Sequence, residues 1–345
     1  MLVSEGTGLK NAVPHLPPVE GEPTPTWDID RLEARSCVVC RGPEHTRVCV
    51  RPDGLLVAQC NACGALFLPQ VPSAGELEAF YRNYSSTKPY LQPHPAERPQ
   101  YAVRIRIAVA HLAGSLLRKV GMWQHVQRMR PLRLSSLCEV LLRTGGLRGK
   151  TLVELGPGPH GGMLPEARLW GGRAIAVEVD SVAANLVAGM GFEVHSSLAS
   201  LSEPVDIFVA SHVLEHLSDP LSAVEEMAAH SRAGARLYVQ TPGGGQALST
   251  GPHWVGYRVD LEHLNYFTEK SLTLLLVQAG FYPECVWLSS QPVLPSYLSE
   301  SNRANFLRNS RRRLSRTIEA AKDDPLQSAG QFALTILARF EPVLS

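Results

Sequence analysis

Glu154-Leu155-Gly156-Pro157-Gly158-Pro159-His160-Gly161 begins within an apolar run, 151–155, and a second apolar run ends at Glu178. The three glycines permit a tight turn between a strand and a helix, and they let a ligand approach the backbone closely. An acid about twenty residues further on can accept the hydroxyls of a ribose. The stretch therefore predicts a nucleotide-type cofactor site on an α/β fold.

Glu154 separates two classes of cofactor. A nicotinamide dinucleotide places its pyrophosphate at a helix N-terminus, where a carboxylate directly before the first glycine would repel it. S-adenosylmethionine carries no phosphate, and its ammonium and sulfonium are cations that a carboxylate attracts. Glu154 thus favours S-adenosylmethionine.

The length and composition are those of an ordinary globular protein. The chain has 345 residues, of which 44% are hydrophobic and 19% charged, enough for one large domain and a smaller one. Its formal net charge of +1 makes nucleic acid an unlikely partner. No run approaches the roughly 18 apolar residues that span a bilayer, and the N-terminus lacks a signal-peptide pattern. We therefore expect a cytoplasmic protein without a membrane span.

Strand and helix signals alternate after residue 149. Strand signals cover 151–155, 174–179, 192–195, 206–211, 235–241, 284–288 and 332–339, and helical patterns cover 162–169, 181–189, 220–230 and 269–279. Such alternation implies parallel strands joined by right-handed crossovers. The prediction is a doubly wound, Rossmann-like α/β sheet.

Two Cys-x-x-Cys pairs lie nearer the N-terminus, at Cys37, Cys40, Cys60 and Cys63. In a reducing compartment this spacing favours a zinc ribbon, with four thiolates around one Zn²⁺, over disulfides. Because four protein ligands leave no open position, the zinc would be structural. Gly42 and Gly64 follow the two pairs, where a chain that wraps over a metal often needs a positive φ.

The remaining segments complete a division into four parts. Residues 1–35 are rich in proline and predict a disordered leader, and 36–84 form the ribbon with a short helix over 74–84. Residues 85–148 form a linker and a helical segment that is a candidate lid. Residues 97–150 include eleven Lys or Arg but only two Glu. This basic segment either recognises a phosphate-bearing acceptor or is a solvated basic face. Residues 149–345 hold the α/β domain, with a helical insertion at about 292–328.

Titratable side chains gather after the fourth and fifth strand signals. His212, Glu215 and His216 follow the strand that ends at Ser211. They are therefore expected at the carboxyl edge of the sheet, where open parallel sheets bind ligands. The string also matches the His-x-x-Glu-His of inverted zinc peptidases, but that motif needs one continuous helix. Alternatively, these side chains only cap the loop. A further cluster, 262–268, brings His263 to the same edge, as a substrate-facing loop or as aromatic packing.

In this order the motifs resemble those of the class I S-adenosylmethionine-dependent methyltransferases. The matching stretches are Glu154-Leu-Gly-Pro-Gly, Val177-Glu178, 213–220, 237–242, 262–268 and the cysteine unit 37–84 with its Phe80-Tyr ending. More narrowly, the chain is similar to bacterial members with an N-terminal zinc ribbon among sugar, polysaccharide and natural-product tailoring enzymes. The resemblance implies a seven-stranded sheet of order 3-2-1-4-5-7-6 whose last strand, 332–339, is antiparallel.

The resemblance also implies roles for particular residues. The cofactor's methionine end is expected at Glu154, Gly156 and Gly158, its ribose at Glu178 and its adenine near Ser197 and Leu198. Gly161 and Ser211 are further candidates for binding the cofactor. His216, His212 and His263 are candidate general bases, because a pKa near 6.5 suits proton abstraction at neutral pH. The acceptor would be small or carrier-bound, such as a sugar, a nucleotide sugar or a natural-product intermediate.

Two questions stay open at this level. Ubiquinone-pathway O-methyltransferases hold a divalent metal on a similar Glu-x-x-Glu-His loop; His212 replaces the first acid here, which puts metal assistance in doubt. The main alternative function is a non-catalytic or RNA-associated binding protein that keeps the cofactor fold, and a nicotinamide-dependent enzyme comes third.

Overall fold

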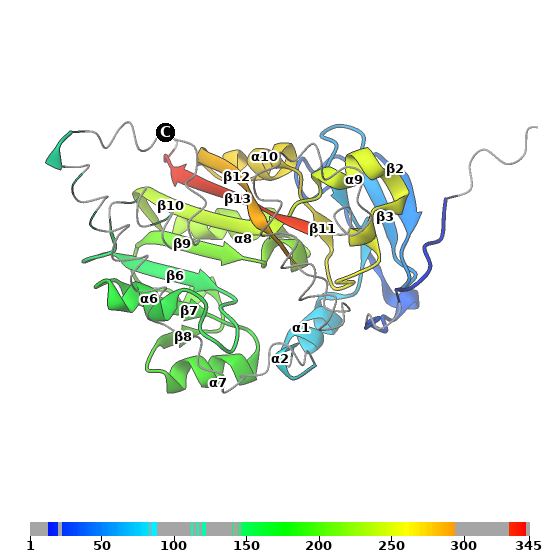
Figure 1. The fold of residues 1–345 in the computed structure, drawn as a ribbon. Helices are drawn as coiled ribbons and strands as arrows, with labels where there is room; N and C mark the ends of the chain where they lie inside the picture. Colours follow the sequence, from blue (N-terminus) through cyan, green and yellow to red (C-terminus); the bar gives the residue numbers. More distant parts are fainter. Residues whose placement is uncertain are drawn as a thin grey trace, which may run out of the picture.

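The centre of the computed structural model is a seven-stranded sheet in the order β12-β13-β10-β9-β6-β7-β8 (Figure 1). The strands are β6 (Thr151–Leu155), β7 (Arg173–Val177), β8 (Glu193–His195), β9 (Val205–Ser211), β10 (Ser231–Pro242), β12 (Phe281–Val293) and β13 (Gln331–Phe340). Among these seven strands, β13 alone is antiparallel to its neighbours, and the other pairs are parallel. Numbered in chain order, the sheet reads 3-2-1-4-5-7-6 from its β8 edge. The predicted α/β fold with a mostly parallel sheet is confirmed.

The structure describes residues 13–19, 23–82, 84–87, 146–293 and 331–342, with isolated positions between 112 and 144. Most of the predicted basic segment and nearly all of the predicted insertion at 292–328 lie outside these residues. No helix of the described residues is long and apolar enough to cross a membrane.

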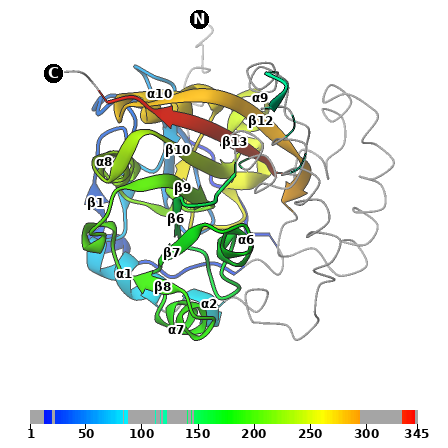
Figure 2. The same cartoon turned by 90° about the vertical axis from the view of Figure 1, so that its left-hand side faces the viewer.

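Helices cover both faces of the sheet. One face carries α8 (Pro220–Ala229) and α10 (Glu269–Gln278), whose leucines join the core of that side; α6 (Leu164–Leu169) packs on the other face, and α7 (Ser181–Gly189) follows β7 (Figure 2). Side chains fix where these helices begin. Asp180 caps α7, Asp219 caps α8, and Thr268 with Ser271 forms a capping box at α10.

We call the described residues from 13 to 87 the N-terminal unit. It contains β1 (Glu33–Ala34), β2 (His45–Val50), β3 (Leu56–Cys60), β4 (Leu66–Phe67), β5 (Gln70–Val71), α1 (Ala74–Arg82) and α2 (Tyr84–Thr87). Its four-stranded sheet has the order β11-β4-β3-β2, and β11 (Asn265–Tyr266) comes from far along the chain. The sheet therefore crosses the boundary predicted at residue 84.

The predicted disorder of residues 1–35 is wrong for the described part of that segment. Leu16 donates its backbone N–H to Val50 O at 2.8 Å, and the indole of Trp27 donates to Asp53 at 3.1 Å. Both side chains are buried in a core that also contains β3 and β4 residues. The segment has few large apolar residues, but the unit that follows it has an apolar surface on which they are buried. This burial compensates the entropy that is lost when the segment becomes ordered.

One hydrophobic core joins the N-terminal unit to the large sheet. Cys37, Val39 and Phe67 belong to the same buried cluster as Leu214 after β9 and Leu275 of α10. Gln278 of α10 also donates to Val39 O at 2.7 Å. Because the two parts share one core, we expect their stabilities to be coupled.

Candidate functional site

The glycine turn after β6 has the backbone geometry that its sequence predicts. Gly156, Gly158 and Gly161 have φ of 57°, 67° and 73°, a region that L side chains enter only at a cost. A Cβ on Gly156 would lie 3.1 Å from Val213, whereas a Cβ on Gly158 would meet no atom within 4 Å. The space at Gly158 lets a ligand contact the main chain, so the turn fits the predicted cofactor.

Glu154 lies inside this turn. Its side chain accepts a hydrogen bond from Met163 N at 2.7 Å and fills the space that a Cβ on Gly162 would need. Burial raises the pKa of Glu154 to about 8, and the nearby charges of Glu166 and Glu178 add to the effect. The carboxyl group therefore supports the turn from within, and without a ligand it holds a proton near neutral pH.

The raised pKa of Glu154 makes a prediction for stability. In the unfolded chain a Glu ionises near pH 4.3, so the ligand-free protein pays an increasing cost between that pH and about 8. We expect Glu154→Gln to raise Tm by about 5 °C at pH 8.5, with a gain that vanishes toward pH 4.5. Differential scanning fluorimetry across this range measures it, with the exposed Glu225→Gln as control. A variant less stable than wild type at every pH would contradict the assignment.

Glu178 closes the same site from the end of β7. Its carboxylate accepts hydrogen bonds from Gly158 N at 3.0 Å and Asp180 N at 2.9 Å, and burial raises its pKa. A carboxylate has about four acceptor positions, so both oxygens can still accept ribose hydroxyls. Asp180 in turn accepts the backbone N–H of Ser85, which places α2 of the N-terminal unit against the predicted ribose acid.

The other residues predicted to contact the cofactor are placed less uniformly. Ser197 is exposed after β8, and Leu198 is buried in the core. Ser211 is half-buried at the end of β9 and donates to the Gln240 side chain at 3.3 Å. Hydrogen bonds thus join Glu178 to Gly158 and Glu154 to Met163, whereas Ser211 bonds to Gln240.

The three predicted histidines meet around one carboxylate, that of Glu215. His212 Nδ1 lies 3.2 Å from Glu215 Oε1. The rings of His216 and His263 are 4.8 Å apart with their planes at 66°. His216 and His212 come from the loop after β9, and His263 comes from the segment before β11. The fold therefore unites two clusters that the sequence shows separately.

The charges of this group are set by burial and by its neighbours. Burial alone would raise the pKa of Glu215, but the hydrogen bond from His212 and the charges of the histidines lower it to about 2. Burial lowers the pKa of His263 to about 3, with the charge of His216 as the second cause. For His212, burial acts downward but Glu215 prevails and raises the pKa. The site thus combines an ionised Glu215 with a neutral His263.

Two tyrosines of the N-terminal unit complete the group. Tyr81 Oη lies 3.0 Å from His216 Nδ1 and donates to Glu262 O at 3.2 Å, and Tyr84 donates to Glu262 Oε1 at 2.6 Å. Neither tyrosine was among the residues that the sequence marked as functional. The only sequence feature that points to them is the run of aromatic residues at the end of α1. Its spacing does not indicate that the partners are His216 and Glu262, which lie far along the chain.

Tyr81 is placed to select one tautomer of His216. Its single proton can be donated to Glu262 O or to His216 Nδ1. When the proton goes to Glu262 O, His216 Nδ1 carries the proton of the bond to Tyr81, and Nε2 holds the lone pair. Burial, followed by the charges of Glu262 and Glu215, raises the pKa of Tyr81 well above its usual value, so the phenol keeps its proton.

The loops that carry the histidines begin with unusual backbone conformations. His212 has φ of 55° and Asp260 has φ of 49°, which non-glycine residues adopt rarely. The backbone N–H of His212 donates to Gln240 O at 2.7 Å, and that of His263 donates to Asp260 O at 2.9 Å. Such conformations persist only where the surroundings hold them, and they cluster at functional sites.

The four predicted zinc ligands also come together. Cys37 and Cys63 have their Sγ atoms 3.5 Å apart, Cys40 and Cys60 3.4 Å, and all four lie within 4.8 Å of one another. Thiolates at 2.3 Å from a tetrahedral zinc would be about 3.8 Å apart, so the set fits the metal. Gly64 has the expected positive φ of 77°, but Arg41 with φ of 60° takes this role in place of Gly42. Gly42 is needed for space instead, since a Cβ would lie 3.3 Å from Cys40 Sγ.

A second set of ligand-type atoms belongs to Glu215, His216 and His263. One such atom from each residue lies within 4.8 Å of the others, and Glu215 and His263 are buried. A carboxylate with two imidazoles suits several divalent metals. The structure thus moves the open question of metal assistance from His212 to His263.

One family model matches the part of the chain that carries this site. A family model described as a methyltransferase domain matches residues 123–286, which include the glycine turn and both histidine loops. Residues 123–286 therefore match a methyltransferase domain, and the prediction that the protein is a methyltransferase is confirmed. Among curated proteins, none matches the chain.

Several solved structures share part of the architecture. Magnesium protoporphyrin IX methyltransferase from Synechocystis PCC 6803 is 13% identical, with a TM-score of 0.45 over 78% of this chain and 100% of its own. Geranyl diphosphate C-methyltransferase from Streptomyces coelicolor A3(2) is 15% identical, with a TM-score of 0.44 over 60% and 76%. A SAM-dependent methyltransferase from Archaeoglobus fulgidus is 18% identical, with a TM-score of 0.39 over 58% and 91%.

Proposed function

We propose that the enzyme moves a methyl group to a small or carrier-bound acceptor, such as a sugar, a nucleotide sugar or a natural-product intermediate, with His216 as general base. The observation that supports this is the group of His216, Tyr81, Glu215 and His263 beside the glycine turn. β6 and β9 are parallel neighbours, so the loops after them lie at the same edge of the sheet. Val213 of the second loop contacts the turn at Gly156.

When bound, S-adenosylmethionine supplies an electrophilic methyl group on a sulfonium. Glu178 would accept the ribose hydroxyls, and the main chain at Gly158 would contact the cofactor. His216 takes the proton of the acceptor atom on Nε2 while Tyr81 holds Nδ1. The ionised Glu215 stabilises the imidazolium that forms, and the neutral His263 fixes the position of the ring.

The charges of the site restrict the reacting end of the acceptor. The Glu215 carboxylate lies beside His216 and His263, and the charge of Glu262 acts on His263, so an anionic group placed among them would be repelled. The reacting end is therefore a neutral hydroxyl or an activated carbon. A phosphate on the acceptor would bind elsewhere, and the basic stretch between 97 and 150 supplies the charges for it.

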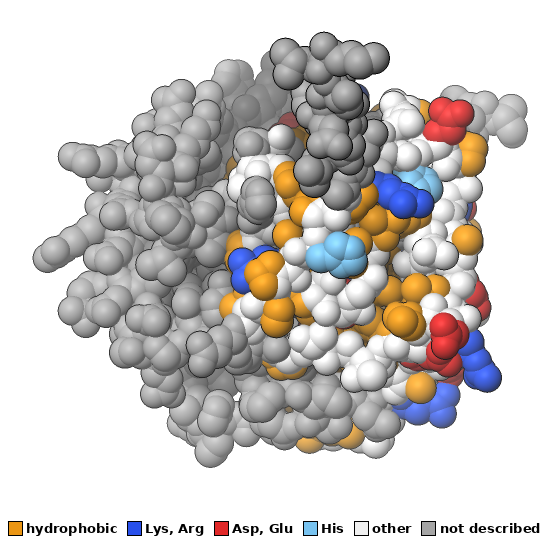
Figure 3. Space-filling model, turned by 90° about the vertical axis from the view of Figure 1, so that its right-hand side faces the viewer, with side chains coloured by type: hydrophobic (Ala, Val, Ile, Leu, Met, Phe, Trp, Pro, Cys, Tyr) orange, Lys and Arg blue, Asp and Glu red, His pale blue; other side chains and the backbone are white. Residues whose placement is uncertain are grey.

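We further propose one structural Zn²⁺ on Cys37, Cys40, Cys60 and Cys63. Four thiolates complete its coordination, so it takes no part in the chemistry. The side of the molecule that carries the N-terminal unit does not favour the RNA-binding alternative. There, acidic and basic side chains of the described residues are interspersed (Figure 3), whereas a nucleic-acid surface gathers basic ones.

Calorimetry tests the cofactor. We expect S-adenosylmethionine and S-adenosylhomocysteine to bind and NAD not to bind, and Gly158→Ala to weaken binding at least tenfold, because a side chain would enter the contact space. Gly149→Ala is the matched control, since Gly149 shares the positive φ and the open surroundings but lies before β6. Binding of NAD without S-adenosylmethionine would overturn the proposal. A panel of keto- and hydroxy-nucleotide sugars, scored by S-adenosylhomocysteine release, then searches for the acceptor.

The alternative mechanism is a divalent metal on Glu215, His216 and His263. Elemental analysis separates the two. One zinc per chain, kept in Glu215→Gln, supports the acid–base mechanism. A second metal in the wild-type protein that is lost in Glu215→Gln while one zinc is kept would favour metal assistance.

A further inference from the structure

The two loops that carry His216 and His263 are joined by main-chain contacts. Leu264 donates its backbone N–H to Glu215 O at 2.8 Å. The side chain of Asn265 donates to Leu217 O at 2.8 Å and to Leu214 O at 3.1 Å. The geometry of the histidine pair thus depends on how this joined pair of loops is held from outside.

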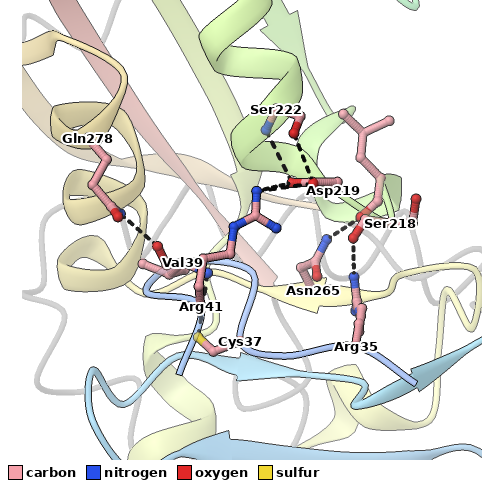
Figure 4. Close-up of polar contacts among 10 residues, drawn as sticks. Arg35, Cys37, Val39, Arg41, Ser218, Asp219, Ser222, Asn265 and Gln278 are labelled. Carbon is pink, nitrogen blue, oxygen red and sulfur yellow. Dashed lines mark hydrogen bonds and ion pairs between the residues drawn. The ribbon is translucent and has the colours of Figure 1, made fainter. Parts of the chain in front are cut away.

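Arg35 of the N-terminal unit holds both loops at once. Its guanidinium donates to Ser218 O at 2.8 Å, just after the His216 loop, and to Leu264 O at 2.7 Å, just after His263. Its Nε is bound to Leu68 O of its own unit at 2.7 Å. Figure 4 shows Arg35 pointing to Ser218, beside Asn265. The planar fork of an arginine fixes such acceptors in direction as well as distance.

Arg51 holds the second loop from another side. It is 2% exposed, forms an ion pair with Asp53 and donates to His263 O at 2.6 Å. It also donates to Leu261 O and to the phenol of Tyr266. Burying a charge is costly unless it is paired and hydrogen-bonded. Arg51 meets both conditions and directs its remaining donors to the backbone on either side of Glu262.

We propose that Arg35 and Arg51 are positioning residues of the methyltransferase, which fix the loops of His216 and His263 from the N-terminal unit. The inference rests on the proposed function of these histidines. It makes the N-terminal unit a part of the active site and not an appended module. The strand β11, which pairs with β4 directly after His263, and the tyrosines of α1 and α2 act in the same direction.

An exposed ion pair between the same parts contributes less. Arg41 lies 3.0 Å from Asp219 in a pair whose side chains are 51% and 41% exposed (Figure 4). Solvent screens such pairs, so they contribute little to stability. The proposal therefore concerns the two arginines that bind carbonyl groups, and not the contacts between the parts in general.

The test uses the full-length, zinc-loaded protein with ¹⁵N-labelled histidine. The variants are Arg35→Met and Arg51→Met, with Arg35→Lys as the conservative change. Arg47→Met is the matched control, an exposed arginine of β2. Long-range ¹H–¹⁵N spectra report the ring nitrogens of His216 and His263, assigned with His→Asn variants. Calorimetry reports the affinity for S-adenosylmethionine, and S-adenosylhomocysteine release reports turnover of the panel acceptor.

In Arg35→Met we expect the His216 and His263 signals to move, kcat to fall about 10- to 100-fold, and the S-adenosylmethionine affinity to stay within twofold. Arg35→Lys should recover part of kcat, and Arg47→Met should match wild type. Arg51→Met is a second test in case one variant fails to fold. If folded variants of both arginines keep wild-type signals and kcat, the proposal is wrong. If the signals move while kcat is unchanged in these variants and in His216→Asn, the loops are positioned as inferred and the catalytic role of His216 fails.

Discussion

Replacing His216 by Asn is expected to lower kcat by about 10² to 10⁴, the range that a general base contributes. Asn retains a polar side chain for Tyr81 but cannot accept the acceptor's proton at neutral pH. Since His216 lies in the loop after β9 and not in the glycine turn, the affinity for S-adenosylmethionine should stay within about twofold. Steady-state release of S-adenosylhomocysteine and calorimetry measure the two quantities.

His230→Asn is the control for this prediction. His230 follows α8 at the opposite edge of the sheet and bonds to Glu226 O. We expect its kcat to equal that of wild type. If His263→Asn abolished turnover and His216→Asn did not, the base would be His263, and its low pKa of about 3 in the ligand-free protein would have to rise when the acceptor binds. If both variants kept full activity, neither histidine would be the base.

Loss of the proposed structural zinc is expected to have the largest effect on stability. Structural zinc contributes its binding free energy to folding, about 10 to 16 kcal/mol in zinc-finger peptides. Cys37 and Cys63 lie in the same core as the leucines of α10. We therefore expect Cys37→Ser or Cys63→Ser to lose the metal and either to fail to fold or to lower Tm by more than about 10 °C. A colorimetric zinc assay and circular dichroism measure both.

Cys285→Ser provides the control, because Cys285 lies on β12 away from the cluster. It should retain one zinc per chain and a nearly unchanged Tm. Wild-type protein that contains no zinc as purified, and whose Tm does not respond to added zinc or chelator, would rule out the structural metal. A single transition at reduced Tm in Cys63→Ser would further support the shared core.

Local signals in the sequence predicted the sheet and the glycine turn. The period of the apolar residues, the caps of α8 and α10 and the positive φ at Gly156 and Gly158 each depend on residues close together in the chain. Parallel strands also place their carboxyl ends at one edge. That rule alone predicts that His216 and His263 lie at the same edge of the sheet.

The cluster of four cysteines could also be predicted from the sequence. The spacing of the two pairs, together with the tetrahedral coordination of zinc, leaves few other arrangements of the four thiols. The disorder predicted for the N-terminal segment failed for a different reason. Whether Leu16 and Trp27 are buried depends on the surface that receives them, and composition alone carries no information about that surface.

By itself the sequence determined the α/β fold, favoured S-adenosylmethionine as the cofactor and identified the histidines as candidates. Only the tertiary structure decided what surrounds them: Tyr81 at His216, Arg35 and Arg51 at the two loops, and β11 as a strand of the N-terminal sheet. The physical reason is the nature of their partners. These side chains bind backbone carbonyls and rings that lie far away in the chain, and every residue has a carbonyl, so no pattern of residue types marks which one will be bound.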